Sequence, residues 1–433
     1  MIDTLPTAIA NGPNLTKDRI GKRYAKERRF KTYGLMAIGA AILMLVVLLS
    51  TIIAQGSSAF QQTHILLPVH FAKEEIDPKG TKDPEVIGKA NYRGIARASI
   101  RAAFPEVRGR RDQRTLFEVF STGVAFTLRE MVLNNPDLIG TTQSIWVKAA
   151  ADIDMLSKGY INRDLPQSER RVNDKQLGWY DKLVSEEKIE KQFNTTFFGH
   201  ADSREPEQAG ILGALVGSAL TLLVTLALAF PIGVASAVYL EEFAPQNKWT
   251  DLIEVNINNL AAVPSIVFGL LGLAVLLNFF GLPRSAPVAG GTVLALMTLP
   301  TIIIAARSSL KAVPPSIREA ALGVGASRLQ TVTHHVLPLA MPGMLTGTII
   351  GMAQALGESA PLLMIGMVAF VVDVPGGFTD AATVLPVQIF LWADAPERAF
   401  VERTSAAIMV LLGFLIAMNL IAILMRKRFE RRW

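Results

Sequence analysis

The chain has 433 residues, of which 50% are hydrophobic and only 18% are charged. This charged fraction is below the roughly 25% of soluble domains, and the positive mean hydropathy also argues against a soluble globular protein. The absence of cysteine excludes a disulfide framework, a thiol nucleophile and a cysteine-based metal site. The net charge of +6 comes from basic segments beside apolar ones, so we interpret it as a topology signal and expect no nucleic-acid partner.

The N-terminal residues 1–33 are basic, and the first charge-free apolar segment follows at residues 34–54. About 20 residues at 1.5 Å each cross about 30 Å of hydrocarbon. This segment is therefore predicted to be a transmembrane helix that runs from inside to outside. Its basic flank is predicted to be a cytoplasmic tail.

Residues 55–208 contain more than half of the charged side chains of the chain, with basic and acidic residues in balance. We expect a periplasmic domain here, held by its own core. Within it, residues 115–159 have helix-like apolar spacing, so the insert is predicted to be mainly helical. The face in question is formed by Leu116, Val119, Phe120, Val124 and Leu128. Two roles stay open: a packed structural domain, or a contact surface for a periplasmic partner.

Five further apolar segments follow, which makes six predicted transmembrane helices in an all-α polytopic protein. They cover residues 211–240, 262–280, 288–306, 344–370 and 405–425, within a transmembrane domain at 209–425. An even number of spans places both termini in the cytoplasm of a bacterial inner-membrane protein, and residues 426–433 form a second basic tail. Glycines spaced four apart predict close helix packing: Gly213 and Gly217, then Gly343, Gly347 and Gly351.

The cytoplasmic loop at residues 307–338 has the signals of two short helices. Ser316 followed by Glu319 has the spacing of a capping box, and Gly323 and Gly325 favour a helix end. Ser327 is predicted to cap a second helix that runs toward Leu337-Pro338. Such a helix-turn-helix suits docking in the groove of a partner protein, although a bare connector between two spans is the alternative.

Part of this loop resembles the EAA loop of ABC importer permeases. The resemblance rests on Glu319-Ala320-Ala321, three further residues, Gly325, and the closing Leu337-Pro338. It implies a type I ABC importer permease bundle whose coupling helix docks on a separate ATP-hydrolysing subunit. The positions that the resemblance assigns to this coupling are Ser316, Glu319, Ala320, Ala321 and Gly325. One departure is His335, where the family usually has an aliphatic residue.

Three longer stretches resemble the A-type permease of the bacterial phosphate-specific transport system. They are residues 206–217 continuing to Tyr239-Leu240-Glu241-Glu242, residues 264–270, and residues 355–363 with Gly357-Glu358-Ser359-Ala360-Pro361. The resemblance covers residue 206 to the C-terminus and implies a phosphate cargo. It also implies three partners: a C-type permease as the second half of a heterodimer, a dimer of ATP-binding subunits, and a periplasmic phosphate-binding protein. Sulfate, molybdate and phosphonate remain alternative cargoes, and a membrane sensor is a further alternative.

No stretch has the Gly-x-x-x-x-Gly-Lys-(Ser/Thr) pattern of a nucleotide-binding loop, so ATP hydrolysis is expected from a partner, with no enzyme activity, cofactor or metal in this chain. For the translocation path, Glu358 is predicted to lie inside the fifth span, about 21 Å along it. Ser359 and Thr346 are possible anion donors. Gln354 stands where related permeases often have an arginine. Arg307 is predicted at the cytoplasmic end of its span, as a membrane anchor or a path residue.

Overall fold

The computed structural model describes residues 17–368 and 370–429. The predicted basic residues Arg431 and Arg432, and residues 1–16 of the N-terminal tail, lie outside the described residues. The chain divides into two compact units, residues 1–54 and 55–433. Each is described separately below.

The first unit consists of one long helix, α1 (Lys17–Gly56), whose last residues enter the second unit. Its 40 residues are about 60 Å long, roughly twice the thickness of the hydrocarbon core. The predicted span at 34–54 is therefore only its C-terminal half. The basic segment that precedes the span is helical too, and an ion pair of 2.8 Å joins Lys31 to Glu27 one turn earlier.

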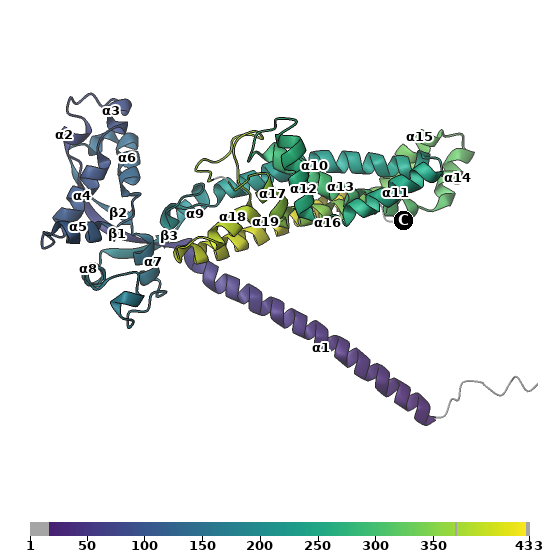
Figure 1. The fold of residues 1–433 in the computed structure, drawn as a ribbon, viewed down its shortest axis with the longest axis horizontal. Helices are drawn as coiled ribbons and strands as arrows, with labels where there is room; N and C mark the ends of the chain where they lie inside the picture. The colour runs from purple at the N-terminus through teal and green to yellow at the C-terminus, as the bar shows by residue number, and fades with distance from the viewer. Residues whose placement is uncertain (1–16, 369, 430–433) are drawn as a thin grey trace, which may run out of the picture. The chain divides into compact units, whose positions relative to one another are not determined.

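The insert contains a three-stranded antiparallel sheet in the order β2-β1-β3 (Figure 1). The strands are β1 (Gln61–His70), β2 (Thr142–Lys148) and β3 (Ile189–Phe193). Central β1 pairs with both neighbours, and its Ile65 lies opposite Val147 on one side and Ile189 on the other. The alternating residues Ile65, Leu67 and Val69 are fully buried, as expected for a strand with one face on a core.

Eight helices surround this sheet, so the expectation of a mainly helical insert is confirmed while the sheet was missed. They are α2 (Lys73–Ile76), α3 (Pro84–Gly88), α4 (Tyr92–Ala103), α5 (Arg110–Phe117), α6 (Val124–Asn134), α7 (Ala151–Ser157), α8 (Asp174–Ser185) and α9 (Thr195–Gly199). The predicted helical stretch at 115–159 is divided between α5, α6, β2 and α7. Pro136 lacks the N–H group needed to continue α6. All five residues of the predicted face nevertheless lie in one buried core.

Within residues 17–368 and 370–429, five helices are long and apolar enough to cross a membrane, and a bent helix pair would make a sixth span. The five include α1, α10 (Leu212–Val238), α13 (Pro287–Lys311), α16 (Leu337–Gly357) and α19 (Ala399–Phe429). The pair consists of α11 (Lys248–Ala261) and α12 (Ser265–Leu271), the latter extended by a π-helical turn at Gly272–Leu277. The two segments meet at an angle of 104°, and the predicted span at 262–280 covers the second of them, which is helical over Ser265–Leu277. Pro264 separates them, and the residue before a proline avoids the helical conformation.

The predicted span at residues 344–370 is also not one helix. α16 starts earlier, at Leu337, and ends at Gly357, and the short α17 (Ala360–Met364) follows. Beyond it, α18 (Leu385–Ala393) is a further helix between the fifth and sixth predicted spans. Gly366, two residues after the end of α17, adopts φ +90°, a conformation that favours glycine.

Close packing of α10, α13 and α16 forms the centre of the bundle. A Cβ atom on Gly347 would lie 2.1 Å from the Ala305 Cβ, and one on Gly343 would lie 2.3 Å from the Ser309 Oγ. Gly217 faces the Thr383 carbonyl, 2.0 Å from where a Cβ would be. The glycine spacing therefore marks close contacts, as predicted, but the partner of Gly217 is a connecting segment rather than a helix.

Candidate functional site

The loop at residues 307–338, predicted to be cytoplasmic, forms α14 (Pro315–Gly323) and α15 (Arg328–Thr331). The predicted cap at Ser316 is wrong, because the helix begins at Pro315 and Ser316 is already inside it. Proline at the first helical position is pre-set for a helix start, since its fixed φ suits the helix and its missing N–H would be unpaired there anyway. No side chain caps this end.

The end of α14 and the start of α15 agree with the sequence prediction. α14 ends at Gly323, and Gly325 adopts φ +91°. Ser327 caps α15 in a reciprocal capping box, in which the Gln330 N–H donates to Ser327 Oγ at 3.2 Å and the Ser327 N–H donates to Gln330 Oε1 at 2.9 Å. The second helix runs toward Leu337-Pro338, as predicted, and does not end there. It continues through a π-helical turn, Val332–Val336, into α16, and such a turn re-spaces the hydrogen bonds just before Pro338.

The outer surface of α14 combines small and apolar residues. Ala321 is buried, whereas Glu319 and Ala320 are exposed. Val324 is 86% exposed and Leu329, in α15, is 62% exposed. Exposed apolar side chains on a loop are typical of a surface that another protein covers.

Arg318 fastens α14 to the rest of the bundle. Its guanidinium donates to both carboxylate oxygens of Glu242, at 2.6 and 3.2 Å, and to the backbone carbonyls of Leu310 and Val313, at 3.0 and 2.8 Å. Glu242 belongs to a π-helical turn, Tyr239–Phe243, that extends α10. The side chains of Glu242 and Arg318 are only 10% and 23% exposed. Helix α14 is therefore tied to the ends of both α10 and α13.

A second cluster of charges surrounds Arg307 near the end of α13. Its guanidinium is 2.5 Å from Glu254 of α11 and 3.5 Å from Glu241, and Lys311 approaches Glu241 at 3.6 Å. Arg307 is thus occupied by carboxylates of this chain. The sequence analysis did not identify Glu241 and Glu254 as partners of Arg307. It also did not identify Glu242 as the partner of Arg318. One sequence signal could have suggested these pairs: the glutamates and the arginines flank predicted spans on the same predicted side of the membrane.

The predicted path residues lie at the end of α16. Glu358 occupies the C-cap with extended backbone angles, so it lies at a helix break and not inside a continuous helix. Glu358 and Ser359 are half-buried, and Gln354 is exposed. Among the described residues, the Glu358 carboxylate has no ion-pair or hydrogen-bond partner. A half-buried carboxylate without a partner in its own chain can pair with a cationic group of another subunit.

Helix α17 directly follows this break and packs on α12. A Cβ on Gly269 would lie 2.7 Å from the Pro361 Cα, so only glycine allows this approach. Two stretches that lie about 90 residues apart in the sequence, 264–270 and 355–363, thus form a single contact beside Glu358.

Arg307 and Glu358 do not come together. Helices α13 and α16 run antiparallel, since Gly343 faces Ser309 and Gly347 faces Ala305. Arg307 is therefore level with residue 345, and Glu358 lies 13 residues further along α16, or about 20 Å at 1.5 Å per residue. Thr346 is near that level, and its hydroxyl donates to the Pro342 carbonyl and accepts from Arg426 at 3.3 Å.

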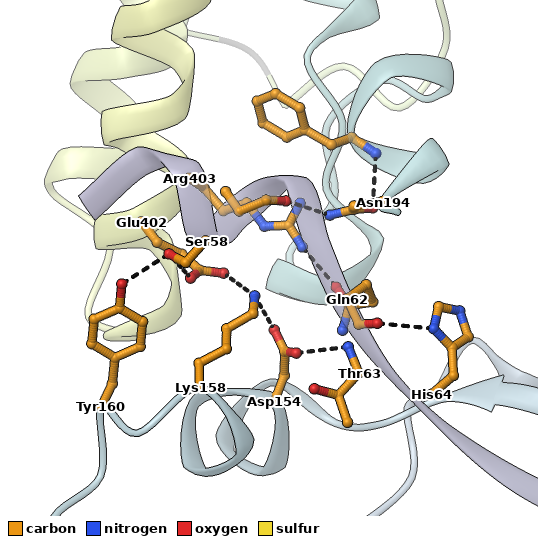
Figure 2. A network of polar contacts seen from close by, with 12 residues as sticks. Ser58, Gln62, Thr63, His64, Asp154, Lys158, Tyr160, Asn194, Glu402 and Arg403 are labelled. Carbon is orange, nitrogen blue, oxygen red and sulfur yellow. Dashed lines mark hydrogen bonds and ion pairs between the residues drawn. The ribbon is translucent and has the colours of Figure 1, made fainter. Parts of the chain in front are cut away.

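A buried polar network joins the insert to the start of α19 (Figure 2). Lys158 pairs with Glu402 of α19 at 2.8 Å and with Asp154 of α7 at 2.7 Å. Asp154 also accepts from the Thr63 N–H at 2.8 Å, and Ser58 donates to Glu402 at 2.8 Å. The three charged side chains are each no more than 5% exposed.

Arg403, the next residue of α19, extends the same network. It is 1% exposed, donates to the Gln62 amide oxygen at 2.9 Å and lies 5.6 Å from the centre of the Phe197 ring. Buried charges with partners on two elements fix the geometry between those elements. The insert and the last long helix are thus joined by their charges, which sequence reasoning missed entirely.

No group of three His, Asp or Glu side chains is placed to hold a metal within residues 17–368 and 370–429.

Comparisons with known proteins divide the chain into two parts. Residues 17–167 match a domain of unknown function, DUF3333. Residues 229–433 match the family of binding-protein-dependent transport system inner membrane components.

Relatives at the level of whole sequences are permeases. The probable ABC transporter permease YqgI of Bacillus subtilis is 35% identical over 36% of this chain and 52% of its own length. The phosphate transport system permease PstA 1 of Mycobacterium tuberculosis is 31% identical over 52% of this chain and 74% of its own. The phosphate transport system permease PstA of Pasteurella multocida is 28% identical over 50% of this chain and 76% of its own length. The chain thus spans about half the length of the Bacillus relative and about three quarters of the others.

Among solved structures, a chain of the inward-facing methionine ABC transporter MetNI is similar in fold. The match covers 51% of this chain and 95% of that chain, at 19% sequence identity and a TM-score of 0.40.

Proposed function

Since this chain belongs to the family of binding-protein-dependent transport system permeases that includes the PstA proteins, we propose that it forms half of the translocation path of an ATP-driven importer of inorganic phosphate. The observation that carries this proposal is the 31% identity to a phosphate permease over 74% of that relative's length. The protein is a multi-pass inner-membrane permease of an ABC transporter and works with other transporter subunits.

The proposed orientation follows the distribution of charge. Both termini and the loop at 307–338 face the cytoplasm, and the insert at 55–208 faces the periplasm. In this arrangement the first span is 34–54, the transmembrane domain is 209–425, and the tails are 1–33 and 426–433. Arg426, Lys427 and Arg428 in the last turn of α19 support a cytoplasmic C-terminus.

The proposed partners are a C-type permease, a dimer of ATP-binding subunits and a periplasmic phosphate-binding protein. ATP hydrolysis belongs to the ATP-binding partner, since the relatives are permease subunits. We assign the docking surface for that partner to Ser316, Glu319, Ala320, Ala321 and Gly325, on or directly after α14. The exposed Val324 and Leu329 supply apolar area next to the Glu319 carboxylate.

The transmission of movement can be followed through Arg318. When the ATP-binding subunits close and displace α14, the five contacts of Arg318 transfer that displacement to α10 through Glu242 and to α13 through its terminal carbonyls. Alternating access requires the spans to move with the coupling segment. A bidentate arginine–carboxylate pair suits this role, because it fixes orientation as well as distance.

For the path itself we propose the group at the end of α16, which consists of the half-buried Glu358 and Ser359 and the exposed Gln354. A carboxylate repels a phosphate anion, so Glu358 is assigned to gating or to orienting a cation, for example an arginine of the second permease. The Ser359 hydroxyl is the proposed donor to the anion. Arg307 is assigned to the cytoplasmic charge cluster, since Glu254 and Glu241 already neutralise it.

The test is transport by the complete complex reconstituted in liposomes with labelled phosphate outside. ATP-dependent uptake that unlabelled phosphate suppresses, and that sulfate, molybdate and phosphonate leave unchanged, is the expected result. Suppression by one of those other anions at lower concentration than by phosphate would reassign the cargo.

A further inference from the structure

A cavity of about 660 Å³ lies where the insert meets the first turn of α19. The insert lines it with residues of the segment 152–171, including Tyr160 and Asn162, and α19 lines it with Val401, directly after Arg398 of the preceding connection. The volume is within the range of 300–1,000 Å³ that is typical of small-molecule sites.

The most unusual residue of this cavity is Arg170. Its side chain is 6% exposed, and its single ion-pair partner is Asp174, a residue whose own side chain is 66% exposed. The Nε and Nη1 atoms of Arg170 are buried and have no hydrogen-bond partner among the described residues. A guanidinium has five N–H donors, and removing its charge from water costs several kcal/mol unless partners replace the water. Arg170 is therefore a buried cation with unused donors.

Two further guanidinium groups line the same cavity. Arg171 donates to the Pro396 carbonyl at 2.8 Å, which holds its side chain between the insert and the connection that leads into α19. Arg398 also lines the cavity and is exposed to solvent. Three arginines from two parts of the fold thus converge on one space.

Two carboxylates, Asp152 and Glu169, also line the cavity. Glu169 is exposed. Burial raises the pKa of the Asp152 carboxyl, an effect that nearby Arg171 opposes and Glu397 reinforces. With three arginines against these two carboxylates, the lining of the cavity has a positive balance.

We propose that this cavity binds a phosphate-class oxyanion through Arg170, Arg171 and Arg398. The planar guanidinium fork matches the oxygens of a phosphate group in a bidentate manner, and such charge-assisted bonds are the strong ones. The source is either free inorganic phosphate or the phosphate of a lipid headgroup, because the cavity lies at the start of a helix that is apolar enough to enter the membrane. The site does not depend on phosphate being the transported cargo.

The experiment measures binding of radiolabelled inorganic phosphate to the purified full-length chain in a neutral detergent, by equilibrium dialysis. The variants are Arg398→Gln, at an exposed residue whose replacement leaves the core intact, and Arg170→Gln. The matched control is Arg163→Gln. Arg163 is in the same segment, but its guanidinium pairs with Asp181 at 3.0 Å and does not line the cavity. A parallel arm uses native mass spectrometry to count retained phosphatidylglycerol against phosphatidylcholine.

Losing one bidentate guanidinium is expected to weaken binding by about tenfold or more in Arg398→Gln, with no change in the control. Saturable binding of free phosphate with this pattern assigns the site to the free anion. Retention of phosphatidylglycerol alone, lost in Arg398→Gln, assigns it to a lipid phosphate. Binding of neither probe, or equal effects of Arg398→Gln and Arg163→Gln, overturns the proposal. Thermal unfolding of each variant shows whether Arg170→Gln acts through the site or through folding.

Discussion

The link between Arg318 and Glu242 provides a sharp test of how movement of the coupling loop reaches the spans. In Glu242→Gln the side chain keeps its size and one carbonyl oxygen but loses its charge. Removing one partner of a fully buried pair costs about 3–5 kcal/mol. This pair is partly exposed and the amide retains an acceptor, so we expect a cost of about 1.5–2 kcal/mol, the difference between charged and neutral hydrogen bonds over two contacts.

A cost of this size corresponds to a more than tenfold larger population in which α14 is detached from α10, since 1.4 kcal/mol is a factor of about ten. The assay compares phosphate taken up with ATP hydrolysed in the reconstituted complex. Hydrolysis should continue in Glu242→Gln while uptake per ATP falls several-fold. Arg318→Lys should act in the same direction, because lysine cannot form the bidentate contact.

The matched control is Asp251→Asn, which removes an exposed carboxylate from α11, on the same side of the bundle. It should leave the ratio of uptake to hydrolysis unchanged. A normal ratio in both Glu242→Gln and Arg318→Lys would refute the role of this link.

Four further results are expected. Glu319→Lys should abolish uptake at a normal membrane level, because a reversed charge on the exposed face of α14 prevents docking; co-purification of the ATP-binding subunits checks this. Glu358→Gln should lower the uptake rate by more than about tenfold if the carboxylate acts in the path, whereas a wild-type rate would make it structural. Lys158→Met should destabilise the chain by about 3–5 kcal/mol, because it leaves Asp154 and Glu402 buried without a cation. The control is Lys182→Met, at a partly exposed pair with Glu106, which should cost less than about 1 kcal/mol. Melting temperatures of the two variants provide the comparison. Burial lowers the pKa of Lys148 from 10.5 to about 8, so its protonated form costs roughly 3 kcal/mol of stability below pH 8. The melting temperature of Lys148→Met should therefore exceed that of wild type at pH 7. This difference should shrink as the pH rises from about 8 towards 10.5.

The sequence predicted most reliably what depends on local chemistry. Ser327 caps a helix because a hydroxyl and the Gln330 amide lie three residues apart, and such a cap needs no other part of the chain. The same reasoning failed at Ser316, since the preceding proline starts the helix one residue sooner. Apolar length located most of the long helices. It could not reveal the 104° bend before α12 or the break at Glu358, because these interruptions do not alter hydropathy.

Features that depend on tertiary contacts could not be predicted. The partner of Arg318 is 76 residues away, and the partner of Lys158 is 244 residues away. Asp154 and Lys158 have the spacing of an ion pair on one helix, but nothing near them indicates Glu402. Strand β1 was missed because its two pairing partners come from distant parts of the insert, residues 142–148 and 189–193.

The most direct test of the central claim is uptake of labelled phosphate at low micromolar concentration in cells that lack only this gene, with and without the gene restored. The account predicts that phosphate uptake is lost, that the wild-type gene restores it, and that Glu319→Lys does not. Unchanged phosphate uptake in the deleted cells, under conditions in which the chain is normally expressed, would contradict phosphate as the cargo.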